Sequence, residues 1–164
     1  MTRLIRRAAP ILLATAALIG LALTTPTKPV QASPSPFDTL LGTWRGSGQV
    51  RLNTGIERLS CNAYYTGGGT QLGLAIRCKS ESSTVEIRSK LSLSGSRLTG
   101  NWEERTYNAE GSATGTARPG RISIQVSGSI TGSMVVNYSR TSQSVSISTS
   151  GSPLQSVSIS LTRS

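Results

Sequence analysis

The chain has 164 residues, with 17 basic side chains, 7 acidic ones and no histidine, which gives a net charge of +10. Its length fits a single domain. Without histidine the commonest general base and metal ligand is missing, and no evident base accompanies the abundant serines. The composition therefore argues against an enzyme, and it predicts neither a metal site nor a cofactor.

The N-terminus has the order of a secretory signal peptide. A basic start is followed by an apolar run over 11–23 and by small residues at Val30 and Ala32, which suit cleavage near Ala32. An uncleaved membrane anchor is the alternative, but this run is shorter than the roughly 18–20 residues that span a bilayer. We therefore expect residues 1–32 to be removed and the protein to be periplasmic or secreted, with no transmembrane span left.

The rest of the chain reads as a linker followed by one β domain over 37–164. Residues 33–36 are rich in Pro and Ser, and 37–41 suit a helical turn capped by Asp38. Alternating apolar residues and regular turn signals then predict ten antiparallel strands. We place them at 43–52, 56–65, 70–79, 83–93, 97–106 and 108–118, and around 122–126, 134–138, 145–147 and 157–163.

Short connections between so many strands favour an up-and-down barrel in which the last strand pairs with the first. A two-sheet β-sandwich is the alternative. In either case one face of each strand points inward. The face of 108–118 holds only Ala and Gly, so either a barrel has room there for a ligand, or Trp102 or Trp44 packs into the space.

Cys61 and Cys78 are the only cysteines, and an even count in an exported domain indicates a disulfide. Closing a loop of this length stabilises a fold by roughly 3 kcal/mol. A tight turn centred on Gly67 and Gly68 would place Cys61 opposite Leu74. We therefore expect a wider loop or a bulge between the two cysteines.

Large or polar side chains with inward phase are the candidates for a ligand cavity. This set consists of Trp44, Tyr65, Trp102, Glu104 and Tyr138. Glu57, Ser89 and Arg163 share the inward phase. Adjacent strand residues face opposite ways, so Glu103 and Glu104 are not placed to act together as a catalytic pair.

A second candidate is the outer face of the first four predicted strands. Its seven basic residues are Arg45, Arg51, Arg58, Arg77, Lys79, Arg88 and Lys90. The chain from residue 33 onward has 13 basic and 7 acidic residues, a net charge of +6. Basic chains often bind nucleic acid, but export argues against that partner. An anionic envelope surface or an acidic periplasmic protein fits better.

A short motif opens the domain: Phe37-x-x-Leu40-Leu41-Gly42-Thr43-Trp44-Arg45. It resembles the opening of the calycin superfamily of lipocalin-like barrels, and is most similar to nitrobindins and fatty-acid-binding proteins. In those proteins a short helix leads into a Gly-x-Trp strand, and nitrobindins continue with Gly-x-Gly, like Gly46-Ser47-Gly48. The whole pattern also resembles a group of uncharacterised exported bacterial barrels.

The resemblance implies a ten-stranded barrel, but the ligand groups of these families do not carry over. Nitrobindins hold haem through a histidine, which this chain lacks. Fatty-acid-binding proteins fix a carboxylate with buried arginines and a tyrosine, and neither Arg140 nor Arg163 matches that motif. Lipocalins pack a late arginine on the first-strand tryptophan, which implies that Arg163 lies against Trp44 in a structural role.

These observations together predict an exported, non-enzymatic protein that holds a small apolar or amphipathic ligand in a β-barrel cavity. The alternative is a periplasmic interaction module. It would be either a protease inhibitor that uses the segment 33–37 or a binder of anionic envelope surfaces that uses the basic face. A purely structural role in the envelope is a third possibility.

Overall fold

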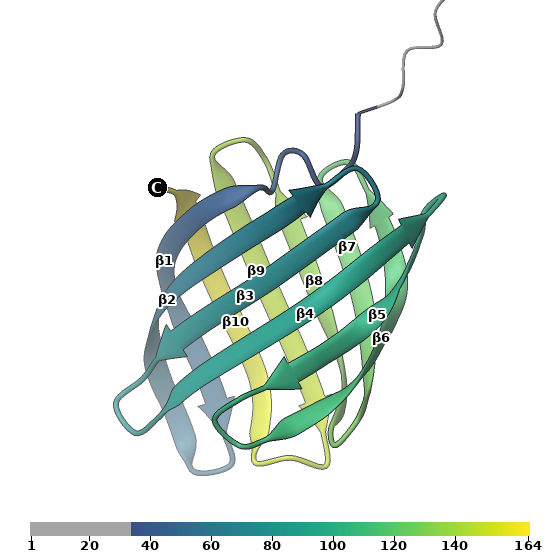
Figure 1. Ribbon diagram of the computed structural model, residues 1–164. Helices are drawn as coiled ribbons and strands as arrows, with labels where there is room; N and C mark the ends of the chain where they lie inside the picture. The colour runs from purple at the N-terminus through teal and green to yellow at the C-terminus, as the bar shows by residue number, and fades with distance from the viewer. Residues whose placement is uncertain (1–33) are drawn as a thin grey trace, which may run out of the picture. The chain divides into compact units, whose positions relative to one another are not determined.

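The computed structural model describes residues 34–164, which form one closed β-barrel (Figure 1). The predicted signal peptide lies outside the described residues. Within them, no helix is long and apolar enough to cross a membrane. The ten strands are β1 (Gly42–Leu52), β2 (Gly55–Gly68), β3 (Gln71–Lys79), β4 (Thr84–Ser94), β5 (Arg97–Glu104), β6 (Ala109–Arg118), β7 (Arg121–Gly128), β8 (Thr131–Tyr138), β9 (Ser142–Ser150) and β10 (Leu154–Arg163).

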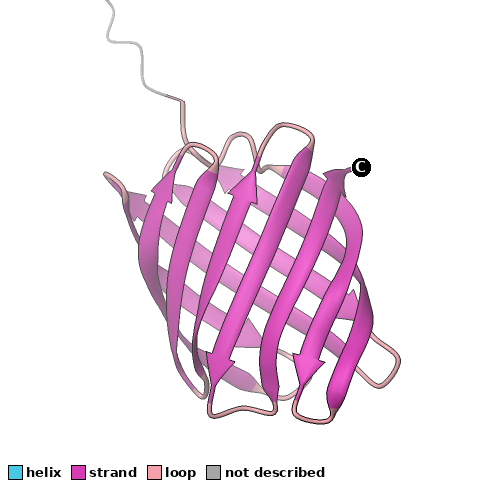
Figure 2. Cartoon of the chain, turned by 180° about the vertical axis from the view of Figure 1, so that it is seen from behind, coloured by secondary structure: helices cyan, strands magenta, loops and turns pink. Residues whose placement is uncertain are grey.

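The strands follow one another as an antiparallel meander, and β10 returns to pair with β1. Figures 1 and 2 show the wall from opposite sides, with strands running obliquely across both faces. The prediction of an up-and-down barrel is therefore confirmed, and the sandwich alternative is wrong. Closure gives β1 and β10 a partner on both sides, so neither is left as an exposed edge.

The predicted inward and outward faces are also confirmed. In β1, Trp44 and Val50 are buried while Arg45 and Arg51 are exposed. The same alternation runs through β2, β3 and β6. One apolar core therefore lies inside the barrel, and the outer wall is polar.

The hairpin between β2 and β3 turns two residues later than expected. Gly68 pairs with Gln71, so the connecting residues are Gly69 and Thr70. This register puts Cys61 directly opposite Cys78, and they form the predicted disulfide with Cα atoms 4.1 Å apart. The expected bulge or wider loop between the cysteines is absent from this hairpin, because the later turn alone brings them into register.

The small residues of β6 follow from the path of the backbone. A Cβ atom on Gly111 would lie 1.8 Å from the Ser127 carbonyl oxygen, and one on Gly115 would lie 2.0 Å from that of Ser123. Neighbouring strands come too close at these points for any side chain, as in strongly coiled sheets. At both positions the close approach of β7 explains the glycine, so the glycine is not by itself evidence of free space inside the barrel.

Candidate ligand site

One end of the barrel is sealed by the segment before β1, which crosses the top of the barrel in Figure 1. Residues 36–40 form turns, and the amides of Leu40 and Leu41 both donate to the Phe37 carbonyl. Phe37 and Leu40 are fully buried. Phe37, the last residue of the segment 33–37 that the protease-inhibitor alternative would use, is thus built into the core.

Side chains from the first and last strands hold this segment in place. The Trp44 indole N–H donates to the Leu40 carbonyl at 2.7 Å, and the Arg163 guanidinium lies 4.4 Å from the centre of the Trp44 ring. Arg163 also donates to the carbonyl oxygens of Thr39, Leu41 and Arg140. The Arg163–Trp44 contact implied by the lipocalin resemblance is present. We call this the sealed end.

The opposite end has a different character. It carries the loops 53–54, 80–83, 105–108, 129–130 and 151–153. Apolar side chains that face inward near these loops are partly exposed, whereas those in the sealed half are almost all buried. The partly exposed set consists of Leu52, Val85, Ile87, Trp102, Val126, Ile147 and Leu154. We call this the open end, because solvent reaches inward-facing apolar groups there.

The structure does not bring the five predicted cavity residues together. Trp44 and Tyr138 belong to the sealed end, where the Tyr138 hydroxyl donates to the Pro36 carbonyl at 2.6 Å. Tyr65 is buried in the same half of the barrel. Only Trp102 and Glu104 lie toward the open end. Except for Leu154, which a register shift opposite Leu52 turns inward, the remaining members of the open end had the correct phase in the sequence. Phase does not tell which end of a strand a residue occupies.

Trp102 packs over a part of β6 that has no side chain. Its partner on β6 is Gly111, and its indole N–H reaches across that strand to the Ser127 carbonyl at 3.3 Å. A Cβ on Gly111 would lie 2.9 Å from the Trp102 Nε1. The ring therefore packs on the glycine, an arrangement that protects glycine backbone in sheets.

Glu104 is buried, and its carboxylate is bound by backbone groups. Its carboxylate accepts hydrogen bonds from the amides of Glu86, Thr106 and Tyr107, at 2.7 to 3.0 Å. These bonds hold the loop after β5 against β4. The predicted role as a ligand group is not what this geometry favours, because its acceptor sites are turned to the loop.

Glu57 is the second carboxylate with inward phase. It pairs with the buried Val50 on β1, and its oxygens accept bonds from the Ser82 amide and hydroxyl. Hydrogen bonds from the Ser80 and Ser82 side chains lower the pKa of Glu57, and the Ser82 amide acts in the same direction. Glu57 is partly exposed at the open end and is an anion at neutral pH.

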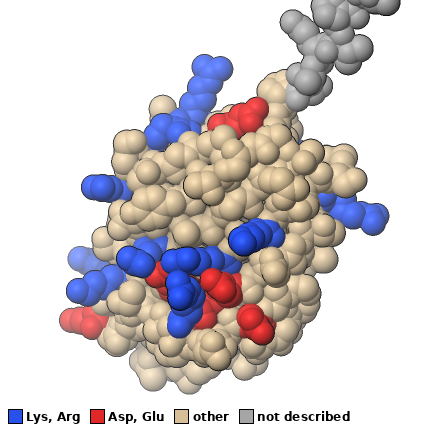
Figure 3. All heavy atoms as spheres, in the orientation of Figure 1, with Lys and Arg blue, Asp and Glu red and all other residues tan. Residues whose placement is uncertain are grey.

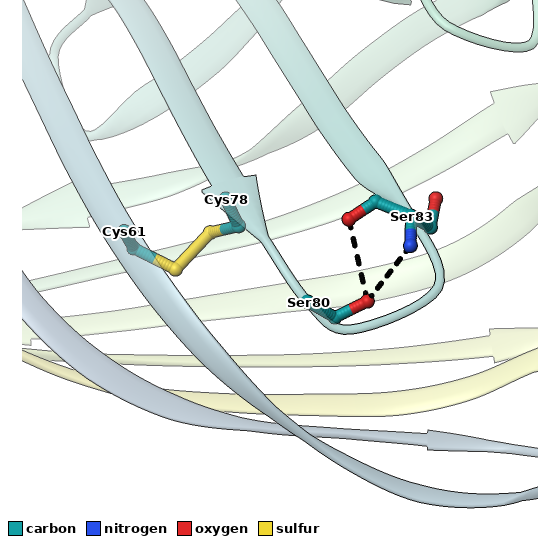
Figure 4. Close-up of a disulfide and its surroundings, with 4 residues drawn as sticks. All are labelled: Cys61, Cys78, Ser80 and Ser83. Atoms are coloured by element: carbon teal, nitrogen blue, oxygen red, sulfur yellow. Dashed lines mark hydrogen bonds between the residues drawn. A yellow bond between two sulfur atoms is a disulfide. The ribbon is translucent and has the colours of Figure 1, made fainter.

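The disulfide braces the wall beside this carboxylate (Figure 4). Cys78 pairs with Val85 of β4, and between these strands the loop 80–83 is closed by bonds between Ser80 and Ser83. The loop that holds Glu57 therefore starts two residues after a covalent cross-link.

A polar pair lies buried in the sealed half. Gln143 donates from Nε2 to the Tyr65 hydroxyl at 2.6 Å, and each residue is 3% exposed. Burial raises the pKa of Tyr65, since the phenolate would be poorly solvated there. Among the described residues, the side-chain amide oxygen of Gln143, Oε1, has no hydrogen-bond partner.

The seven basic residues all project outward and are exposed, as predicted. They are not a uniform positive surface. Arg77 and Arg88 both form ion pairs with Glu86, and Arg88 stands opposite Glu103 on β5. Figure 3 shows basic and acidic groups side by side on this face. Within the described chain, no group of Cys, Asp and Glu side chains is arranged to hold a metal ion.

Comparison with known proteins supports the fold. No protein-family model matches the chain, and no curated protein matches its sequence. The crystal structure of Rv2717c from Mycobacterium tuberculosis is similar, with a TM-score of 0.64 and 14% identity over 78% of this chain and 94% of that one. The S-type phycobiliprotein lyase CPES from Guillardia theta gives a TM-score of 0.50 and 12% identity, covering 77% and 89%.

Both similarities concern architecture alone, because the sequence identities are low. Together with the ten-stranded meander, they show that the chain has a calycin-like barrel fold.

Proposed function

We propose that this protein is an exported, non-enzymatic binding protein that takes a small apolar or amphipathic ligand through the open end of its barrel. The observation that carries the proposal is the ring of seven partly exposed apolar side chains facing inward at that end. Leaving such groups in contact with water is unfavourable, and burying them against a ligand would recover about 25 cal/mol per Å².

The difference between the two ends of the barrel supports entry of the ligand at the open end. The sealed end is closed by Phe37 and Leu40 and by the hydrogen bonds of Arg163. At the open end, strands are joined by short polar loops. Two hollows lie away from the open end, one of about 630 Å³ over β1, β2 and β10 and one of about 480 Å³ over β8–β10 at the sealed end, and most of their lining residues are polar or Gly. An apolar molecule is better matched by the open end.

The export part of the proposal rests on the N-terminal sequence and on the disulfide, which persists in an oxidising compartment. Binding is preferred to catalysis because Glu104 is engaged by three backbone amides and Glu57 by Ser82. Neither carboxylate is paired with a second acid–base group.

The test begins with native mass spectrometry of the protein recovered from its own cell envelope. We expect a co-purified small molecule whose mass is lost on organic extraction. The extracted protein should rebind it, and Ile147→Glu at the open end should abolish rebinding. Ile56→Glu is the matched control, because Ile56 is 53% exposed on the outside of the barrel.

The proposal fails if wild-type protein neither carries a ligand nor binds dodecanol. It also fails if Ile147→Glu and Ile56→Glu bind equally well. Circular dichroism melts of both variants show whether loss of binding reflects loss of fold. Should Ile147→Glu not fold, Val126→Ser serves instead, since it removes apolar surface from the same end without adding a charge.

A further inference from the structure

We infer that the ligand of the open end carries a positively charged or hydrogen-bond-donating group and not a carboxylate, with Glu57 as the group that receives it. This inference rests on the proposed function and names the class of molecule bound. It is carried by the position of Glu57 among the apolar residues and by the lack of an opposing charge on the inner wall.

Glu57 has the geometry of a receptor group at a site entrance. Its backbone pairs with Val50, whose side chain is buried, so the carboxylate is on the inner side of β2. Ser82 bonds fix its orientation. A carboxylate has about four acceptor positions, and the loop supplies three donors, the Ser80 hydroxyl and the Ser82 hydroxyl and amide, which leaves about one position. The group is therefore both oriented and able to accept a further hydrogen bond.

No basic group of the inner wall neutralises this charge. Among inward positions of the described strands near the open end, the charged residues are Glu57 and Glu104, with no Lys or Arg. The ion pairs found in the described residues join Arg77 and Arg88 to Glu86 on the outer wall. Arg163 has inward phase, but it lies at the sealed end and is bound to three backbone carbonyls.

A second acceptor lies deeper in the barrel. Within residues 34–164, the one buried side-chain nitrogen or oxygen without a partner is Oε1 of Gln143. This oxygen could accept a hydrogen bond from a donor. A ligand carboxylate would bring a further acceptor to a wall on which Gln143 Oε1 already lacks a donor, and it would be repelled by Glu57. An ammonium, hydroxyl or amide group would be matched by Glu57.

The open end should prefer a cationic ligand to an anionic one, although the overall positive charge of the protein favours anions. The chain from residue 33 onward has a net charge of +6, so non-specific attraction favours anions. We expect dodecylammonium to bind about tenfold more tightly than dodecanoate, a difference of about 1.4 kcal/mol. Dodecanol should fall between them, because it donates a hydrogen bond without a charge.

The experiment is isothermal titration of the signal-processed, disulfide-bonded protein with these three probes, at concentrations below micelle formation. Glu57→Gln keeps the size of the side chain and removes its charge, so it should bring the three affinities to within about twofold. Glu81→Gln is the matched control. Glu81 lies in the exposed loop at the same end, and its removal should leave the preference unchanged.

Wild-type protein gives an independent reading that needs no variant. Added salt should narrow the gap between dodecylammonium and dodecanol, since a charge interaction at a partly exposed site is screened. If all three probes bind equally, or dodecanoate binds best, the inference is overturned while the proposed function stands. If none binds, the proposed function itself fails. If Glu57→Gln and Glu81→Gln lose the preference for dodecylammonium to the same extent, the preference comes from the net charge of the protein and not from Glu57, and the inference is overturned.

Discussion

Trp44 joins the first strand, the sealing segment and the C-terminus. Its ring is fully buried, its N–H bonds to Leu40 and its face receives the Arg163 guanidinium. These contacts explain why a tryptophan opens β1: no smaller side chain both fills the space and donates the bond. Although predicted to line the cavity, Trp44 lies among residues that close the barrel.

Truncation of this side chain should therefore be costly. We expect Trp44→Ala to lower the free energy of unfolding by about 3–5 kcal/mol, as core truncations of large side chains do. Trp44→Phe retains most of the volume but leaves the Leu40 carbonyl without its donor, which should cost about 1 kcal/mol or more. Urea denaturation measures both. An unchanged midpoint for Trp44→Ala would contradict the structural role.

Tyr65 makes the stability of the barrel depend on pH in the alkaline range. Burial raises the pKa of Tyr65, and it raises that of Tyr138 in the same direction. In the unfolded chain a tyrosine loses its proton near pH 10. Above that pH the unfolded state binds fewer protons than the folded state, so the free energy of unfolding falls as pH rises.

Tyr65→Phe should make this fall less steep. One proton accounts for about 1.4 kcal/mol per pH unit, and the Tyr138 contribution should remain. Tyr64→Phe is the control, because Tyr64 is 46% exposed on the outer wall. Chemical denaturation between pH 8 and about pH 12 tests the prediction. If both variants keep the wild-type slope, Tyr65 is not the group responsible.

At the scale of elements, the β2–β3 hairpin shows what a single sequence can and cannot specify. Three consecutive glycines at 67–69 predict a turn, but they do not determine which two residues connect the strands. The structure uses Gly69, whose φ is +58°, together with Thr70. Only the requirement that two inward cysteines face each other could have fixed the register in advance.

The disulfide should contribute measurably to that hairpin. Its cysteines are 17 residues apart, which corresponds to roughly 3 kcal/mol by loop-closure entropy. The double variant Cys61→Ala, Cys78→Ala should lose about this much in urea denaturation. Because the bridge supports the loop at Glu57, we also expect the variant to bind dodecylammonium more weakly. An equally stable variant would show that the strand register alone holds the hairpin.

Most of the strand pattern was predictable because each strand repeats a simple alternation. In β6 the period of two is unbroken, and turn residues such as Gly120 mark the ends, whereas β10 keeps it only after a register shift near Leu154. The position of a residue along the barrel axis was not predictable in the same way. Trp44 and Trp102 have the same inward phase, yet one lies in the sealed end and the other in the open end.

At the scale of the molecule, the barrel is asymmetric in two directions. Along its axis, a sealed end faces away from an open end with exposed apolar groups. Around its circumference, ion pairs and basic residues gather on β1–β4, while the outward positions of β9 and β10 are mostly serines. The polar outer wall keeps the barrel compatible with water and leaves the apolar open end as its distinctive surface.

The central claim is that ligands enter at the open end, and the two tryptophans provide a direct measurement. Trp102 lies in the open end and Trp44 in the sealed end, so their indole N–H groups give two NMR signals at opposite ends of one barrel. During titration with dodecanol, we predict that the Trp102 signal moves while the Trp44 signal stays in place. Movement of Trp44 alone, or of neither signal at saturating dodecanol, would contradict the account.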